Sequence, residues 1–211
     1  MNKVLILSPH TDDAELGAGG TIHKYLEQGR DIFWVVFSTA EESLPKNMPK
    51  NTLEKEFIEV TKRLNLNKNQ YLIKKFHVRK LHENRQEILE LLVKIRNEFS
   101  PDLVLGPSLN DFHQDHIVVA TEMVRAFKSH ASIISYELPW NNVVFHTQYF
   151  EKLTKKQIES KQMILECYQS QVLKKRSYFN KDFILGLGKT RGIQINADYA
   201  ESFEVIRWIN D

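Results

Sequence analysis

Histidine and aspartate side chains gather in two short stretches of the sequence, about a hundred residues apart. The first is residues 9–15, PHTDDAE, and the second is residues 113–116, HQDH. A nitrogen donor at His10 and an oxygen donor at Asp13 can converge on one ion when a tight turn brings them to the same side. Zinc accepts that mixture of ligands, and a third ligand would come from the second stretch. Together the two stretches predict a metal site.

Each polar stretch lies where a buried strand is expected to pass into a helix. Residues 4–7 (VLIL) and 103–105 (LVL) are continuous apolar runs, typical of strands that are buried on both faces. The glycine-rich run 17–20 is expected to open the helix after the first stretch, and helical spacing of apolar residues follows the second. In an open parallel sheet such junctions lie at the carboxyl edge, where ligands bind. We expect both stretches to share that edge.

Strand-like and helix-like segments alternate through the rest of the chain. The apolar patterns predict further strands and helices, namely strands at 32–37, 71–73, 133–136 and 143–145, and helices around 21–28, 57–64, 88–99 and 158–172. This alternation predicts a single domain over residues 1–211, a Rossmann-like three-layer α/β/α sandwich with a mostly parallel sheet. An apolar content of 42% is sufficient for one core of this size.

Composition excludes several classes of protein. A net charge of +2 without a concentrated basic region argues against a nucleic-acid partner, and the basic residues 174–176 (KKR) are interpreted as solvated surface rather than a phosphate or lipid site. No apolar run is long enough for a membrane anchor, and the start of the chain lacks the pattern of a signal peptide. The single cysteine, Cys167, excludes an internal disulfide and favours a cytoplasmic location. A homo-oligomer remains open.

The two polar stretches resemble those of the PIG-L/LmbE-like zinc-dependent de-N-acetylases. Residues 169–171 (QSQ) and 199–204 (YAESFE) extend this resemblance over most of the chain. Thr11 stands where many members have proline, and Glu15 lies one position later than the glutamate of members that read D-D-E. The resemblance implies an enzyme that removes the acetyl group from an N-acetylglucosamine moiety of a larger conjugate, releasing acetate and a free amino sugar.

The positions that match the family motifs imply a ligand set and a general base. His10, Asp13 and His116 are the expected ligands of Zn²⁺, although Fe²⁺, Co²⁺ or Mn²⁺ suits the same donors. Asp12 is adjacent to a ligand and is expected to face the other way. We therefore interpret Asp12 as the base that takes a proton from water and passes it to the departing amine.

Further residues near the second stretch are expected to assist. A protonated His113 would stabilise the oxyanion, with Asp115 holding its tautomer and its charge, and Asp111 helping to orient it. In the loop after the second strand, Thr39 and Glu41 are candidate substrate contacts by resemblance, and solvated loop residues are the competing interpretation.

Several interpretations remain open in the sequence. Arg191 and Glu201 either contact the cleft or lie on the surface, and Trp140, Phe112 and Tyr136 either form an aromatic wall for a sugar ring or pack in the core. The run 17–20 lacks the G-x-G-x-x-G spacing of a dinucleotide site. The alternatives to a de-N-acetylase are a zinc amidase acting on a non-acetyl or non-sugar amide and a noncatalytic sugar- or nucleotide-binding α/β module.

Overall fold

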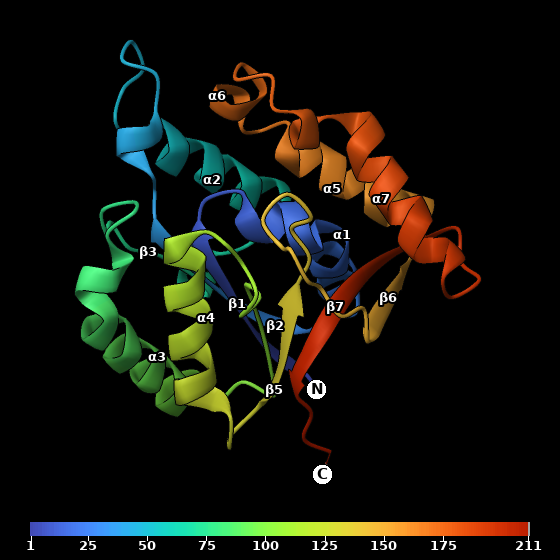
Figure 1. Ribbon diagram of the computed structural model, residues 1–211, viewed down its shortest axis with the longest axis horizontal. Coiled ribbons are helices and arrows are strands. Elements are labelled where there is room, and N and C mark those ends of the chain that lie inside the picture. The colour runs from blue at the N-terminus through green and yellow to red at the C-terminus, as the bar shows by residue number, and fades with distance from the viewer. Residues whose placement is uncertain (211) are drawn as a thin grey trace.

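Alternating apolar side chains make the first strand part of two hydrophobic cores at once. Val4 and Ile6 pack on one face of the sheet, and Leu5 and Leu7 pack on the other; all are fully buried. This is the pattern of a central strand that helices cover on both faces. The computed structural model describes residues 1–210 and shows this strand near the middle of a three-layer α/β/α arrangement (Figure 1).

The sheet has seven strands and is mostly parallel, as predicted. In spatial order the strands are β3 (Tyr71–Ile73), β2 (Asp31–Ser38), β1 (Lys3–His10), β4 (Leu103–Gly106), β5 (Ser132–Tyr136), β7 (Tyr199–Arg207) and β6 (Tyr149–Leu153). The first five strands in this order pair in parallel, and β7 is antiparallel to both of its neighbours. The strand expected at 143–145 is wrong, because these residues form a loop before β6.

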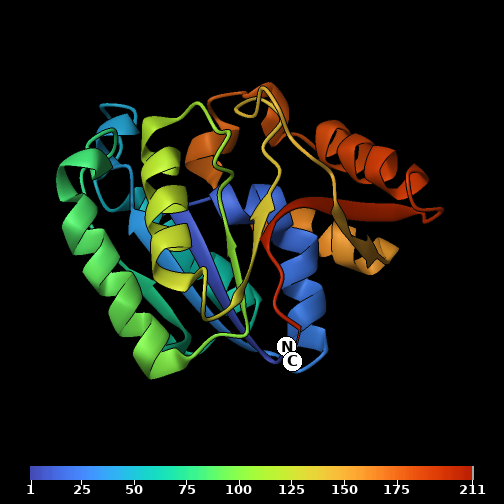
Figure 2. The ribbon, with the colours of Figure 1, turned by 60° about the horizontal axis from the view of Figure 1, so that its bottom comes forward.

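Helices cover both faces of this sheet (Figures 1 and 2). One core contains residues from α3 (Arg85–Phe99) and α4 (Gln114–Phe127), and the other contains residues from α1 (Asp13–Glu27), α2 (Thr52–Arg63), α5 (Lys155–Leu165) and α7 (Lys181–Ile193). The helix expected at 158–172 is instead divided into α5 and the short α6 (Gln169–Val172). Within residues 1–210, no helix has both the length and the apolar character needed to cross a membrane.

The strand order changes direction between β1 and β4. The chain runs from β1 outward to β2 and β3 and then returns to place β4 on the other side of β1, with Ile6 opposite Leu105. A crevice at the carboxyl ends of strands forms at such a switch point. Because the two polar stretches follow β1 and β4, the prediction that they share one edge of the sheet is confirmed.

The glycine-rich run lies inside α1 and serves its packing. A β-carbon at Gly17 would lie 2.5 Å from Cδ2 of Tyr136 on β5, so only glycine permits this approach of helix to sheet. The helix kinks at Ala18, and the backbone N–H groups of Gly20 and Thr21 then donate to the carboxylate of Glu201 over 3.1 and 2.7 Å. Glu201 is therefore buried rather than on the surface, and its carboxylate caps an internal break in α1.

Candidate metal centre and active-site cavity

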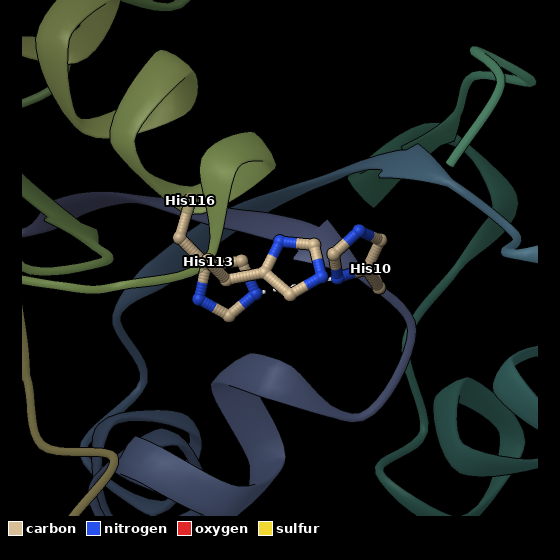
Figure 3. A group of neighbouring side chains, drawn as sticks. All are labelled: His10, His113 and His116. Atoms are coloured by element: carbon tan, nitrogen blue, oxygen red, sulfur yellow. Dashed lines mark hydrogen bonds between the residues drawn. The ribbon is translucent and has the colours of Figure 1, made fainter. Parts of the chain in front are cut away.

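The two polar stretches place their side chains at the ends of two strands and the starts of two helices. His10 is the last residue of β1, Asp12 is the N-cap of α1 and Asp13 is its first residue. His113 is the N-cap of α4, and His116 lies in its first turn. Figure 3 shows the three imidazole rings side by side, with His10 coming from the strand and the other two from the start of α4. Residues far apart in sequence thus meet at one point.

Three donor atoms form a tight triangle at this point. The Oδ2 atom of Asp13 lies 3.1 Å from Nδ1 of His10 and 3.1 Å from Nε2 of His116, and these two nitrogens are 3.3 Å apart. Ligands of a tetrahedral zinc ion, each about 2.0–2.2 Å from the metal, have a similar mutual spacing. A nitrogen of His113 also lies within 4.8 Å of nitrogens on His10 and His116. Two sets of three donors are therefore geometrically available. Both contain His10 and His116, and the third donor is either Asp13 or His113.

The outer nitrogens of the two shared histidines are held by carboxylates. Nε2 of His10 lies 2.8 Å from Oδ2 of Asp115, and Nδ1 of His116 lies 2.7 Å from Oδ2 of Asp111. When each ring donates its N–H to that carboxylate, both inner nitrogens present lone pairs toward Asp13. Three electron-rich atoms this close together are stabilised by a cation between them, and carboxylate–histidine pairs of this kind are usual around metals. The residues therefore fit a divalent metal ion.

The pKa shifts within the cluster also indicate that this site favours positive charge. Burial alone would lower the pKa of His116, but Asp13 and Asp111 outweigh it and raise that pKa to about 10. Burial would also lower the pKa of His10, but Asp13 and Asp115 together raise it. The two histidines in turn hold the pKa of Asp13 well below its usual range despite burial. A metal ion would take the place of the protons that these histidines otherwise retain.

Asp12, next to the ligand candidate Asp13, has an unusual backbone conformation. Its φ of 82° lies in the left-handed region, which is unfavourable for a residue other than glycine and is often found at functional sites. Burial, together with the charges of Asp13 and Glu15, raises the pKa of the Asp12 carboxyl. A carboxylate with a raised pKa is a stronger proton acceptor than an ordinary surface aspartate.

The expected partnership of His113 with the Asp115 carboxylate is corrected by the structure. That carboxylate is turned toward His10 and toward the backbone N–H of Leu81, at 3.2 Å. Instead, the backbone N–H of Asp115 donates to Nδ1 of His113 over 3.2 Å, which leaves the proton of the neutral ring on Nε2. Burial, with His10 and His116 nearby, lowers the pKa of His113 to about 4. His113 is therefore a neutral donor rather than the expected imidazolium.

The cluster lies at one side of a cavity of about 160 Å³. We call this side the floor, formed by His10, Asp12, Asp13, His113 and His116. A second group of lining residues, which we call the rim, comes from the loop after β5 and from the segment after α6, and consists of Trp140, Lys174, Arg176 and Tyr178. From the sequence, Trp140 could belong either to a sugar-binding wall or to the core, and Lys174 and Arg176 were expected to be solvated surface residues. The ring of Trp140 stacks on that of Tyr178 at 3.9 Å and 9°.

Other candidate residues lie elsewhere. Arg191 pairs with Glu137 and lines a separate small cavity, so this pairing places it away from the metal cluster. Thr39 is buried, with its hydroxyl donating to Glu41, and the loop lines the cavity through Ala40 and Ser43 instead.

Three more side chains that the sequence left open are also placed. The hydroxyl of Tyr168 donates to the buried carboxyl of Glu15 over 2.5 Å, which puts Glu15 in the core. Tyr136 is fully buried, and Phe112 is 72% exposed. Of the three aromatic residues considered for a sugar-binding wall, Trp140 is the one that lines the cavity.

Comparisons with known structures agree with this fold. A conserved protein of Thermus thermophilus is 22% identical, with a TM-score of 0.80 over 100% of this chain and 97% of the other. The N,N'-diacetylchitobiose deacetylase of Pyrococcus horikoshii is 18% identical, with a TM-score of 0.76 over 97% and 84%. A 4-carboxy-2-hydroxymuconate hydratase of Pseudomonas putida is also 18% identical, with a TM-score of 0.78 over 100% and 99%. The fold is therefore shared by a deacetylase and a hydratase.

The family comparison covers the part of the chain that builds the floor. Residues 5–127 match the family described as GlcNAc-PI de-N-acetylase, PIG-L. This range contains both polar stretches and the carboxylates that orient them, whereas the cations of the rim lie beyond it. The chain therefore belongs to the PIG-L family of de-N-acetylases.

Proposed function

We propose that this protein is a metal-dependent hydrolase that removes the acetyl group from an N-acetylglucosamine moiety of a larger conjugate. The observation that carries the proposal is the arrangement of the floor, where Asp12 lies beside three metal-donor atoms in one cavity. Family membership supports the reaction, and the sugar rests on the family description. We also propose a cytoplasmic setting, because the one cysteine has no partner within the chain.

His10, Asp13 and His116 would hold the metal ion, with Asp115 and Asp111 fixing the two rings. Mixed nitrogen and oxygen donors favour Zn²⁺ and also accept Fe²⁺, Co²⁺ or Mn²⁺. When bound, such an ion polarises a carbonyl group and makes water more acidic.

Two side chains of the floor then divide the proton chemistry. The Asp12 carboxylate accepts a proton from the attacking water and returns it to the nitrogen of the departing amine, so that the C–N bond breaks and acetate leaves. The neutral His113 presents an Nε2–H donor to the oxygen that becomes negative in the tetrahedral intermediate. Both roles rely on groups that burial and backbone contacts hold in place before substrate arrives.

Two other activities are compatible with the same machinery. One is hydrolysis of an amide that carries a different acyl group or no sugar. The other is addition of water to a carbon–carbon double bond, which the hydratase of similar fold favours as a second candidate. A noncatalytic sugar- or nucleotide-binding module is disfavoured, because binding alone gives no reason for a base and an oxyanion donor beside a metal cluster.

Acetate release from N-acetylglucosamine conjugates is the test. We expect release by metal-loaded protein, none after chelation, and a 10²- to 10⁴-fold lower kcat in Asp12→Asn, because a general base contributes about that factor. Glu41→Gln removes a nearby carboxylate outside the cavity and serves as the control. Release that survives in Asp12→Asn would refute the assignment of the base. One metal per chain without acetate from any conjugate would redirect the proposal to the other acyl groups or to hydration.

A further inference from the structure

Glu15 and Tyr168 form a buried pair close to the candidate base Asp12. The hydroxyl of Tyr168 donates to Oε1 of Glu15 over 2.5 Å, and both residues are fully buried. The other carboxyl oxygen, Oε2 of Glu15, has no hydrogen-bond partner among residues 1–210. Neither side chain lines the cavity. Within the described part of the chain, Tyr168 therefore supplies the one side-chain hydrogen bond that fixes this carboxyl group.

The position of Glu15 links this pair to the turn that carries Asp12. Asp12 is the N-cap of α1 and Glu15 is the third residue of the helix, from which a glutamate side chain can reach back to the N-cap backbone. Burial raises the pKa of the Glu15 carboxyl to about 8, and Tyr168 together with the backbone N–H groups of Glu15 and Asp12 opposes that rise. The backbone of Asp12 thus lies beside the carboxyl group that Tyr168 holds.

The side chain of Asp12 does not stabilise its own turn. An N-cap aspartate normally accepts a hydrogen bond from a backbone N–H of the first helical turn, but the Asp12 carboxylate makes no such bond. Its φ of 82° is also unfavourable for a residue that has a β-carbon. Backbone in such a conformation persists only where the surrounding structure fixes it. The Asp12 carboxylate thereby remains available for proton transfer, and other groups have to hold the turn.

Tyr168 is itself fixed by the helices around it. It is the N-cap of α6, its backbone N–H donates to the carbonyl of Leu165 over 3.1 Å, and its ring meets that of Phe179 edge to face. Helices α1 and α5 pack so closely that a β-carbon at Gly19 would lie 2.9 Å from Cγ of Lys161. The hydroxyl of Tyr168 therefore has a defined position relative to the start of α1.

We propose that Tyr168 and Glu15 are positioning residues that hold the Asp12 turn in its left-handed conformation, so that the Asp12 carboxylate is directed at the attacking water. This inference rests on the proposed function, in which Asp12 is the base. Tyr168 fixes the carboxyl group of Glu15, and Glu15 stabilises the backbone of Asp12. Because Tyr168 lies outside residues 5–127, a C-terminal side chain would support the floor that the family-matching residues build.

The main test is Tyr168→Phe, which removes the hydroxyl and keeps the ring. We expect kcat for acetate release to fall about 10- to 100-fold, because a small displacement of a catalytic group has an effect of that size. KM should change less than about 3-fold, and one metal ion should remain bound per chain, because the ligands and the cavity lining are unchanged.

Tyr25→Phe is the matched control. The Tyr25 hydroxyl is also fully buried and donates to a carboxylate, Oε1 of Glu151, over 2.7 Å. Tyr25 lies on the same helix, α1, but outside the cavity. With both variants assayed well below their melting temperatures, Tyr25→Phe should keep kcat within about 3-fold of the wild type.

Further variants separate positioning of the base from general stability. In Asp12→Asn protein the base is already lost, so adding Tyr168→Phe should lower the residual kcat less than about 3-fold. Glu15→Gln keeps an oxygen that accepts from the Tyr168 hydroxyl and should retain most of the wild-type kcat. Glu15→Leu removes that oxygen and should lose as much kcat as Tyr168→Phe.

Amide hydrogen exchange measured by NMR tests the turn without an activity assay. The backbone N–H of Leu16 donates to the carbonyl of Asp12 over 2.9 Å, which makes it a reporter of the first turn of α1. In metal-loaded protein we expect this amide to exchange about 10-fold faster in Tyr168→Phe than in the wild type, and at the wild-type rate in Tyr25→Phe.

Three results would overturn the inference. They are an unchanged kcat in Tyr168→Phe, an equal loss in Tyr25→Phe, and a loss that persists in full in the Asp12→Asn background. The proposed function fails separately: faster exchange at Leu16 in Tyr168→Phe, without acetate release by the wild type, would refute the hydrolase and retain the role of the pair in holding the turn. Acetate release that Tyr168→Phe leaves intact would retain the hydrolase and refute the positioning role.

Discussion

The floor and the rim of the cavity differ in whether their charged and polar side chains have charged partners. On the floor every imidazole has a defined partner, and the two outer nitrogens of His10 and His116 are each fixed by a carboxylate. On the rim two cations meet only neutral acceptors. The floor is also the more buried side, with His116 only 1% exposed, while Arg176 is exposed. The paired and buried side chains of the floor suit a catalytic reaction. The cations of the rim, which lie beside solvent without charged partners, suit recognition of a ligand.

The sequence positions of the two sides support this division. The floor lies within the residues that match the family, and the rim cations lie after them. Changes on the floor should therefore affect metal content and kcat, and changes on the rim should affect KM.

Asp13→Ala removes the one carboxylate oxygen that touches both inner histidine nitrogens. We expect loss of stoichiometric metal and of all measurable acetate release, because two histidines alone do not complete a site. Metal content by elemental analysis and acetate by an enzymatic assay provide the measurement. Full metal occupancy in this variant would show that His113 replaces Asp13 as the third ligand.

His113→Ala tests the other donor set. If His113 is an oxyanion donor, the variant should keep its metal and lose about 10²- to 10³-fold in kcat. The pH dependence sharpens the result, because a pKa lowered to about 4 leaves the ring neutral throughout the range above that value. The ratio of wild-type to variant kcat should then be constant between pH 5 and 8. An imidazolium donor would instead make that ratio fall about 10-fold per pH unit above about 6.5.

Asp111→Asn keeps the size of the side chain but weakens its hold on Nδ1 of His116. Metal affinity should fall about 10- to 100-fold, with kcat largely restored at saturating metal, because second-layer partners orient ligands without contacting the substrate. Competition with a chelator of known affinity measures the change. An affinity equal to that of the wild type would show that this carboxylate is not needed to orient the ring.

Trp140→Ala removes the ring that stacks on Tyr178. We expect KM for sugar conjugates to rise about 2- to 10-fold, in line with the modest energy of aromatic contacts, with metal content and kcat nearly unchanged. Steady-state kinetics with saturating metal separate the two parameters. A fall in kcat as large as that of His113→Ala would contradict the separation of floor and rim.

The floor was predictable because local rules specify it. A buried strand that passes into a helix puts the next polar residues at the carboxyl edge, so the two polar stretches could be brought together from the sequence pattern. The choice of His116 rather than His113 as the third ligand rested on the family resemblance. The hydrogen-bond partners of individual side-chain atoms could not be predicted in this way. Whether the Asp115 carboxylate turns to His113 or to His10 depends on side-chain rotation within a few ångströms, which residue spacing does not fix.

The rim was missed for a different reason. Lys174 and Arg176 follow a helix that ends early, and the position of that segment depends on packing between α2, α5 and α6 rather than on its own pattern. As a sequence, KKR is indistinguishable from solvated surface. Arg191 shows the converse, because resemblance made it a candidate for the cleft and a nearby carboxylate, Glu137, holds it elsewhere. The strand expected at 143–145 was wrong because a short apolar run does not by itself specify a strand.

The most direct test of the metal centre is a crystal of the zinc-loaded protein measured at the zinc absorption edge. We predict one anomalous peak at about 2.0–2.2 Å from Nδ1 of His10, Oδ2 of Asp13 and Nε2 of His116, with His113 free of the metal. No peak between these atoms, or a peak bound by His113 with Asp13 turned away, would contradict it.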